Sequence, residues 1–165
     1  MKTFAHLNSA NEVVGIGMIY FEGGGFTPGV AEYVDQFGED AGIVAYGNSV
    51  KHDAGLTTVL IDTTEMPGGG HMNYDKLFRN AFKHGGGKKV DVDVPKAKLI
   101  THERRRAKRA EEFKPLDIQA TIPSQAAAAE AARQVIRDRY EAMQLAIDAC
   151  TTADQLKAII VTEGI

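Results

Sequence analysis

The chain of 165 residues contains a single cysteine, Cys150. One cysteine excludes an internal disulfide framework and a zinc site built from cysteines, and its place at the end of an amphipathic stretch predicts a small buried side chain. No apolar run reaches the roughly 18 residues that a transmembrane helix requires, so we expect no membrane partner. The apolar stretch after Lys2 is too short and too polar for a secretory signal, so we expect a protein that stays inside a cell or inside something assembled there.

Sequence patterns for catalysis and metal binding are also missing. The five histidines include no pair four residues apart and no His-x-His, the spacings that bring two metal ligands together on one helix or strand. No nucleophile–base signature occurs, and the acidic residues from Asp62 to Asp93 form no carboxylate pair that spacing alone can assign. We therefore expect no enzyme, no metal and no cofactor, while a metal site assembled from distant segments stays open.

The composition is that of a globular protein, with 44 % hydrophobic and 25 % charged residues. The formal net charge of −3 means that the whole molecule is not a polycation that seeks nucleic acid. The length suits one ordinary domain or two small modules.

The first 70 residues have the pattern of strands and turns. Phe4 to Leu7 and the β formers from Val13 to Phe21 flank a polar turn, which predicts a hairpin. Further elements expected in this half are a short helix at 31–37 and strands at 42–46 and 56–62. The segment Met66–Gly70, which contains a proline and three glycines, ends the half as a linker.

From residue 72 onward, helical spacing dominates. Asn73 is expected to cap a helix at 74–82, glycines stop it, and a strand follows at 90–94. Pro95 is expected in the first turn of the next helix, which runs to Phe113 and is ended by Pro115. Ser124 is expected to cap a long helix that reaches Ala149, and Thr152 with Gln155 resembles a capping box. We therefore predict an α+β protein with a β-rich docking module at 1–70 and a mainly helical module with one long helix at 72–165.

The glycine segment His84–Lys89 has two interpretations. A phosphate loop needs a strand, a glycine turn and then a helix, with Ser or Thr after the lysine. Here the expected order is helix, glycines and strand, and no Ser or Thr follows. The pattern favours a helix stop with a hairpin turn.

The densest positive cluster lies on the helix after Pro95, at Arg104, Arg105, Arg106, Lys108 and Arg109. Such a charge run usually marks a solvated helix face, here with pairs such as Lys108–Glu112. Contact with an acidic protein neighbour is the main alternative. Nucleic-acid contact is the minority interpretation, because no aromatic residue interleaves to stack on bases.

An apolar stripe on the long helix is expected to be buried within the chain or against a partner. It consists of Val135, Ile136, Tyr140, Met143 and Ile147. Together with the cluster it supplies the candidate residues for partner docking, which are Arg104, Arg105, Lys108, Arg109, Val135, Tyr140 and Met143.

Several ordered segments carry a family resemblance. They are YDKLFRNAF (74–82), VDVDVPKAKLI (90–100), LD (116–117), RD (137–138) and TTADQLKAI (151–159). Their order resembles a family of small proteins encoded near the tail and virion structural genes of tailed bacteriophages. The family has an FR-x-A-aromatic helix, a strand, a K-A-x-x-I helix and a T-T-x-x-x-L-K pattern. The matching residues are Phe78, Arg79, Ala81, Phe82, Lys96, Ala97, Ile100, Thr151, Thr152, Leu156 and Lys157.

The resemblance covers about residues 72–160; the glycine turn and the alanine-rich 126–132 depart from it. It implies a virion or tail-assembly role and no catalytic residue. We expect a structural or accessory component at the tail, baseplate or fibre attachment, located in the virion, whose partners are other virion proteins or its own copies. A tail-fibre assembly chaperone that is absent from the mature particle is the alternative.

Overall fold

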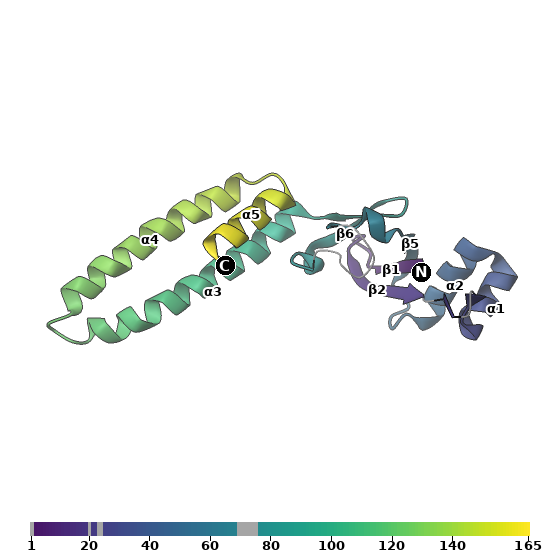
Figure 1. Ribbon diagram of the computed structural model, residues 1–165, viewed down its shortest axis with the longest axis horizontal. Coiled ribbons are helices and arrows are strands. Elements are labelled where there is room, and N and C mark those ends of the chain that lie inside the picture. Colours follow the sequence, from purple (N-terminus) through teal and green to yellow (C-terminus); the bar gives the residue numbers. More distant parts are fainter. Residues whose placement is uncertain (1, 20, 23–24, 69–75) are drawn as a thin grey trace. The chain divides into compact units, whose positions relative to one another are not determined.

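The computed structural model describes residues 2–19, 21–22, 25–68 and 76–165 (Figure 1). The chain divides into two compact units, Met1–Asp93 and Val94–Ile165. The first contains all the strands of the described residues, and the second is helical. The predicted α+β class, with a β-rich first module and a helical second module that has one long helix, is confirmed.

The first unit is built on a three-stranded antiparallel sheet in the order β2-β1-β5. The strands are β1 at Lys2–Leu7, β2 at Val13–Ile19 and β5 at Thr57–Ile61, so the predicted hairpin and the strand near 56–62 are confirmed. In the turn after β1, the side chain of Asn8 accepts hydrogen bonds from the amides of Ala10 and Glu12, and both bonds are 3.0 Å long. Because β1 is the central strand, its residues from Thr3 to Leu7 are all buried.

Two helices, α1 at Pro28–Phe37 and α2 at Glu39–Val50, pack on the sheet face that contains Phe4. The helix expected at 31–37 is thus confirmed, whereas the strand expected at 42–46 is wrong. A short apolar run does not by itself distinguish a strand from a buried helix face. Here Ile43 and Gly47 lie one turn apart and both are buried, because Gly47 allows α2 to approach the ring of Phe4.

The opposite face of the sheet is covered by a second hairpin, formed by β6 at Phe82–Gly86 and β7 at Lys89–Val92. Phe82 and Val90 pack in one cluster with Ala5 and Leu7 of β1. Main-chain bonds join the hairpin to the sheet's loops: the amide of His84 donates to the Asn11 carbonyl over 2.9 Å, and that of Asp62 to the Lys88 carbonyl over 2.7 Å. The boundary therefore falls after Asp93 rather than near residue 70, because 82–92 complete the core of the first unit.

The helix expected at 74–82 is wrong where the structure describes it; Asn73 and Tyr74 lie outside the described residues. A single 3-10 turn, η3, spans Arg79–Ala81, and Phe82 already pairs with Val92 in the β ladder. The apolar side chains Phe78, Ala81 and Phe82 are buried by this turn and the strand that follows it, without a helix. The glycine segment forms the predicted hairpin turn, in which Gly86 and Gly87 have φ of 94° and 57°, the left-handed region that glycine enters without steric cost.

Three further short elements of the first unit lie among the described residues. They are β3 at Phe21–Glu22, β4 at Gly25–Phe26 and the 3-10 turn η1 at Thr63–Glu65.

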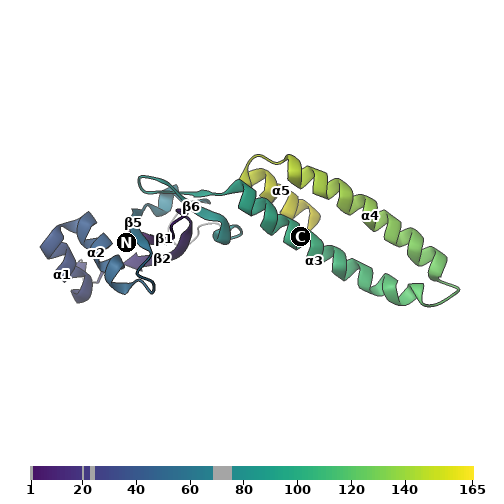
Figure 2. The same ribbon diagram turned by 180° about the vertical axis from the view of Figure 1, so that it is seen from behind.

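The second unit is a helical hairpin with a third helix at its base (Figures 1 and 2). The helices are α3 at Val94–Ala120, α4 at Ala126–Ala149 and α5 at Ala153–Glu163. Both views show α5 beside the half of the hairpin that lies next to the α4–α5 turn. Pro95 lies in the first turn of α3, and Thr152 forms the capping box with Gln155, as predicted.

Two predicted helix ends are wrong. Pro115 lies inside α3, which continues to Ala120. Pro115 is exposed, and on both sides of it α3 forms ion pairs with α4, through Glu112 and Asp117. Ser124 does not cap α4, which begins after Gln125 without a side-chain cap.

The apolar stripe of α4 is buried for the most part. Tyr140, Met143 and Ile147 are buried, as predicted, whereas Ile136 is only half-buried. Val135 is 68 % exposed, so its predicted burial is not met within this chain. The reason is geometric, because Val135 lies about 100° around the helix from Ile136.

Glycines in the core of the first unit permit a direct test of packing. A Cβ on Gly17 would lie 2.1 Å from the ring of Phe4, its partner in the ladder, whereas a Cβ on Gly29 of α1 meets nothing within 4 Å. We expect Gly17→Ala to lower the free energy of unfolding by about 1–3 kcal/mol through overpacking. Gly29→Ala is the control and should leave stability unchanged or raise it by up to about 1 kcal/mol. Denaturant unfolding measures both, and equal stabilities would contradict this packing of Phe4.

Candidate docking surface

The seam between α3 and α4 starts on α3 with three buried residues spaced four apart, Ala97, Thr101 and Arg105. This spacing places them on one face of the helix. The Thr101 hydroxyl donates to the Ala97 carbonyl over 2.8 Å, which satisfies it inside the seam. Arg105 continues the same face, so its side chain enters the hairpin instead of the solvent.

Arg105 is 7 % exposed, and its Nη1 donates to the main-chain carbonyl of Tyr140 over 2.8 Å. Its Nε is buried and has no hydrogen-bond partner among the described residues. Burial lowers the pKa of the Arg105 guanidinium, and the nearby cations Arg106 and Arg109 lower it further. The prediction that Arg105 lies on a solvated face is therefore wrong, because four-residue spacing continues the buried stripe through the basic run.

Tyr140 connects this seam to a network that crosses the hairpin. Its hydroxyl donates to Oε1 of Glu112 over 2.9 Å, and Arg139 pairs with the other carboxylate oxygen of Glu112. The Arg139 guanidinium also lies 4.9 Å from the centre of the Tyr140 ring. Burial, followed by the interaction with Glu112, raises the pKa of Tyr140. The predicted pair between Lys108 and Glu112 does not form, because Glu112 is engaged across the hairpin.

The structure separates the predicted docking residues into two groups. Arg105, Tyr140 and Met143 are buried inside the hairpin, so no partner reaches them while α3 and α4 stay together. The other four have accessible side chains and are Arg104, Lys108, Arg109 and Val135.

The cations of the basic run lack carboxylate partners among the described residues, in contrast to the rest of the hairpin. Arg104, Arg106 and Lys108 are exposed, and Arg109 lies 5.3 Å from the centre of the Phe113 ring. No ion pair joins any of them to a described acidic residue. Further along the hairpin, every basic residue is paired, and these pairs are Lys114–Glu111, Arg133–Asp117, Arg133–Glu130, Arg137–Glu130 and Arg139–Glu112.

The distal half of the hairpin, residues 110–139, has little buried apolar surface. Ala129 is its one buried residue, and its larger apolar side chains in the seam, Phe113, Leu116 and Ile136, are half-buried. At the base, by contrast, Leu156 and Ile160 of α5 are buried. A third helix therefore completes the core at the base, and the distal half is a two-helix layer.

The base carries a compact set of polar contacts. His102 Nε2 lies 2.9 Å from Oδ1 of Asp148, and Lys98 Nζ donates to the Asp148 carbonyl over 2.6 Å. The thiol of Cys150 is buried and donates to the Ala146 carbonyl over 3.2 Å, as expected for a packed cysteine. The contacts of His102 and Lys98 join α3 to the C-terminal end of α4, where cations are favoured by the helix dipole.

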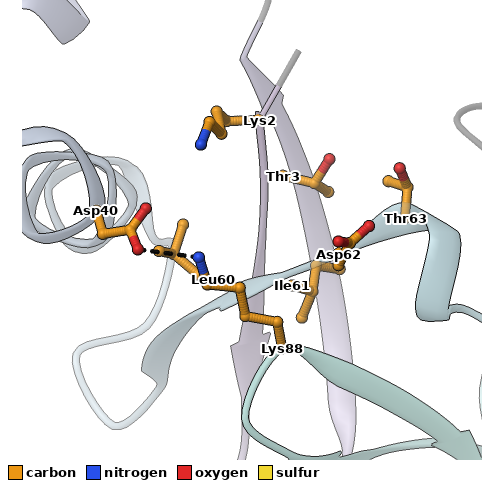
Figure 3. A pocket seen from close by; sticks show the side chains of 8 residues that line it. All are labelled: Lys2, Thr3, Asp40, Leu60, Ile61, Asp62, Thr63 and Lys88. Carbon is orange, nitrogen blue, oxygen red and sulfur yellow. Dashed lines mark hydrogen bonds and ion pairs between the residues drawn. The ribbon is translucent and has the colours of Figure 1, made fainter.

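The first unit has a polar hollow at the edge of its sheet (Figure 3). It is lined by Lys2, Thr3, Asp40, Leu60, Ile61, Asp62, Thr63 and Lys88. Lys88 Nζ pairs with Asp40 over 2.9 Å, and this hydrogen bond lowers the pKa of Asp40. Hydrogen bonds from the hydroxyl and the amide of Thr64 lower the pKa of Asp62. The opposite charges of the lining balance, so the hollow has the character of an ion-paired surface.

His6 and His84 each form a hydrogen bond within the first unit. His6 is buried and hydrogen-bonds Thr58 over 3.1 Å, and burial lowers its pKa. His84 Nε2 lies 3.1 Å from the Gly87 carbonyl in the hairpin turn. In the described residues no three His, Cys, Asp or Glu side chains are grouped to hold a metal ion; His71 lies outside them. Over the same part of the chain, no helix combines the length and the apolar character needed to cross a bilayer.

The chain matches no protein-family model, no curated protein and no solved structure. A functional proposal therefore depends on the contacts and charges described above and on the resemblance of the sequence.

The position of Arg105 predicts different outcomes for two neighbouring arginines. Arg105→Ala should lower the free energy of unfolding by about 1–3 kcal/mol, because it removes a buried stem and a charged hydrogen bond. Arg104→Ala is the matched control and should change it by less than about 0.5 kcal/mol.

A third variant separates packing from charge. Arg105→Met keeps the apolar stem without a buried cation, so it should cost less than Arg105→Ala. Denaturant unfolding of the full chain measures all three. Equal stabilities of Arg105→Ala and Arg104→Ala would contradict the buried position of Arg105.

Proposed function

We propose that this chain acts by protein–protein docking, as a structural or accessory component of a tailed-bacteriophage particle at the tail, the baseplate or the fibre attachment. The observation that supports docking is the distal half of the helical hairpin, whose seam has one buried residue, Ala129, and no third helix. Isolated helices gain most of their stability from packing an apolar face. A partner that covers the distal seam would supply the packing that α5 supplies at the base.

Apolar side chains outside the seam extend this surface. Ile118 and Val135 are each 68 % exposed on the two helices of the distal half, and Ile122 is exposed in the turn between them. Single exposed apolar residues are common on protein surfaces. Their significance here is that they are exposed on the two helices whose seam the chain leaves half-covered.

The assignment to a phage particle is supported by the resemblance of the sequence, and the motif residues occupy structural positions. Phe78, Ala81 and Phe82 are buried in the first unit. Thr152 caps α5, and Leu156 is a buried residue of the same helix. Residues of this kind maintain a fold, which suits a family whose role is assembly.

Mass spectrometry of purified particles tests the assignment to a virion. In a phage whose genome encodes this chain, we expect the protein in stoichiometric amount in the particle. Its absence from particles together with its presence in infected cells would instead support the assembly chaperone.

Single substitutions test the docking surface. We expect Ile118→Asp and Val135→Asp to reduce incorporation into particles while changing the free energy of unfolding by less than about 0.5 kcal/mol, because both side chains are exposed. Leu99→Asp is the control, since Leu99 is similarly exposed, at 63 %, but lies on α3 at the base of the hairpin. Normal incorporation of both distal variants would contradict docking through this half.

A further inference from the structure

The two units carry net charges of opposite sign. Met1–Asp93 contains seven Lys or Arg residues and twelve Asp or Glu residues, a net charge of −5. Val94–Ile165 contains twelve and ten, a net charge of +2, and together the units give the −3 of the chain. A molecule with one acidic and one basic unit has electrostatic complementarity to other copies of itself.

The unpaired charges of the basic unit are concentrated on α3. Arg104 and Lys108 lie one turn apart on the same exposed face, and no described carboxylate pairs with either. Residues spaced in this way have Cβ atoms about 5–6 Å apart. The face thus presents two adjacent cations that the chain's own described carboxylates leave unneutralised.

Unpaired carboxylates of the acidic unit occur on α1. Glu32 and Asp35 lie one turn apart, both exposed, and no described cation pairs with either. The next two carboxylates along the chain are engaged, since Glu39 pairs with Lys2 and Asp40 with Lys88. Glu32 and Asp35, three residues apart, therefore present two adjacent anions on one helix face, as Arg104 and Lys108, four residues apart, present two adjacent cations on α3.

We propose that the chain associates with further copies of itself, α1 of one copy docking through Glu32 and Asp35 onto the face of α3 in the next copy that carries Arg104 and Lys108. The contact joins two different surfaces. Made once between each pair of copies it is heterologous, and its repetition generates a ring or an open chain, whereas made reciprocally it closes a two-fold dimer. It uses surfaces other than the distal seam, so it holds or fails independently of the proposed function.

A polyanion is a poorer fit to the basic face than a discrete pair of carboxylates. Glu103 and Glu111 flank the cluster on the same helix, and they repel a continuous row of phosphates. The aromatic residue nearest to the cluster, Phe113, already packs against Arg109. A small acidic helix face contacts Arg104 and Lys108 between the flanking glutamates.

Exposed ion pairs are weak and are screened by salt, so the association between copies should be weak and should depend on salt concentration. Association should be detectable by sedimentation velocity at low ionic strength, should increase with protein concentration, and should decrease at about 1 M salt, where the Debye length falls to about 3 Å.

Two charge-reversed chains provide the decisive experiment. Arg104→Glu/Lys108→Glu makes both docking faces acidic, and Glu32→Lys/Asp35→Lys makes both basic. Each variant alone should lose association by at least about tenfold in apparent Kd, a difference of about 1.4 kcal/mol. An equimolar mixture of the two should associate again, because every contact between unlike copies is then complementary.

Arg137→Glu is the control, since it reverses a charge in the same unit on α4, leaves Glu130 paired with Arg133, and should associate like the unaltered chain. Circular dichroism of each variant checks that it is folded. A monomeric unaltered chain at every salt and protein concentration, or a mixture of folded variants that does not associate, would overturn the proposal. Association restored only by added duplex DNA would assign the basic face to nucleic acid and overturn it as well.

Discussion

The hydrogen bond from Arg105 to the main-chain carbonyl of Tyr140 links α3 to α4 inside the seam of the helical unit. It joins positions 35 residues apart in the sequence at the point where the three-helix base gives way to the two-helix distal half. A charged donor inside the seam needs an acceptor there, because an unpaired buried guanidinium has a large desolvation cost. Tyr140 then extends the contact to Glu112 and Arg139, so one register of the hairpin satisfies several polar groups together.

The pairing of α3 with α4 also determines which basic residues of α3 have a carboxylate partner. Glu112 turns inward to Tyr140 and Arg139, and Glu111 pairs with Lys114, so neither glutamate neutralises Arg104 or Lys108. The basic face of α3 is therefore a product of the tertiary contacts. It also has a different character from the distal seam, where charges are paired and apolar packing is incomplete. The basic face of α3 thus suits a partner with an acidic helix face, and the distal seam suits a partner with an apolar surface.

The first unit depends on a different constraint, the burial of the central strand on both faces. Phe4 faces α1 and α2, while Ala5 and Leu7 face the β6–β7 hairpin. Glycines at 17 and 47 allow the ring of Phe4 to lie between β2 and α2. This packing explains why residues 82–92 belong to the first unit although they follow a glycine-rich segment that has the composition of a linker.

Local chemistry in the sequence determined the α+β class, the N-terminal hairpin, the capping box at Thr152 and the buried stripe at Tyr140, Met143 and Ile147. Each of these follows from spacing or from hydrogen bonds between residues close in sequence. Tertiary structure alone decided that 42–46 is helical, that Pro115 lies within α3, and that Arg105 is buried. In each of these cases the deciding partner is remote in sequence: the Phe4 ring for α2, and α4 for Arg105 and for the helix around Pro115. Periodicity identifies an apolar or charged face, but the surface it meets depends on the register of elements that the sequence places far apart.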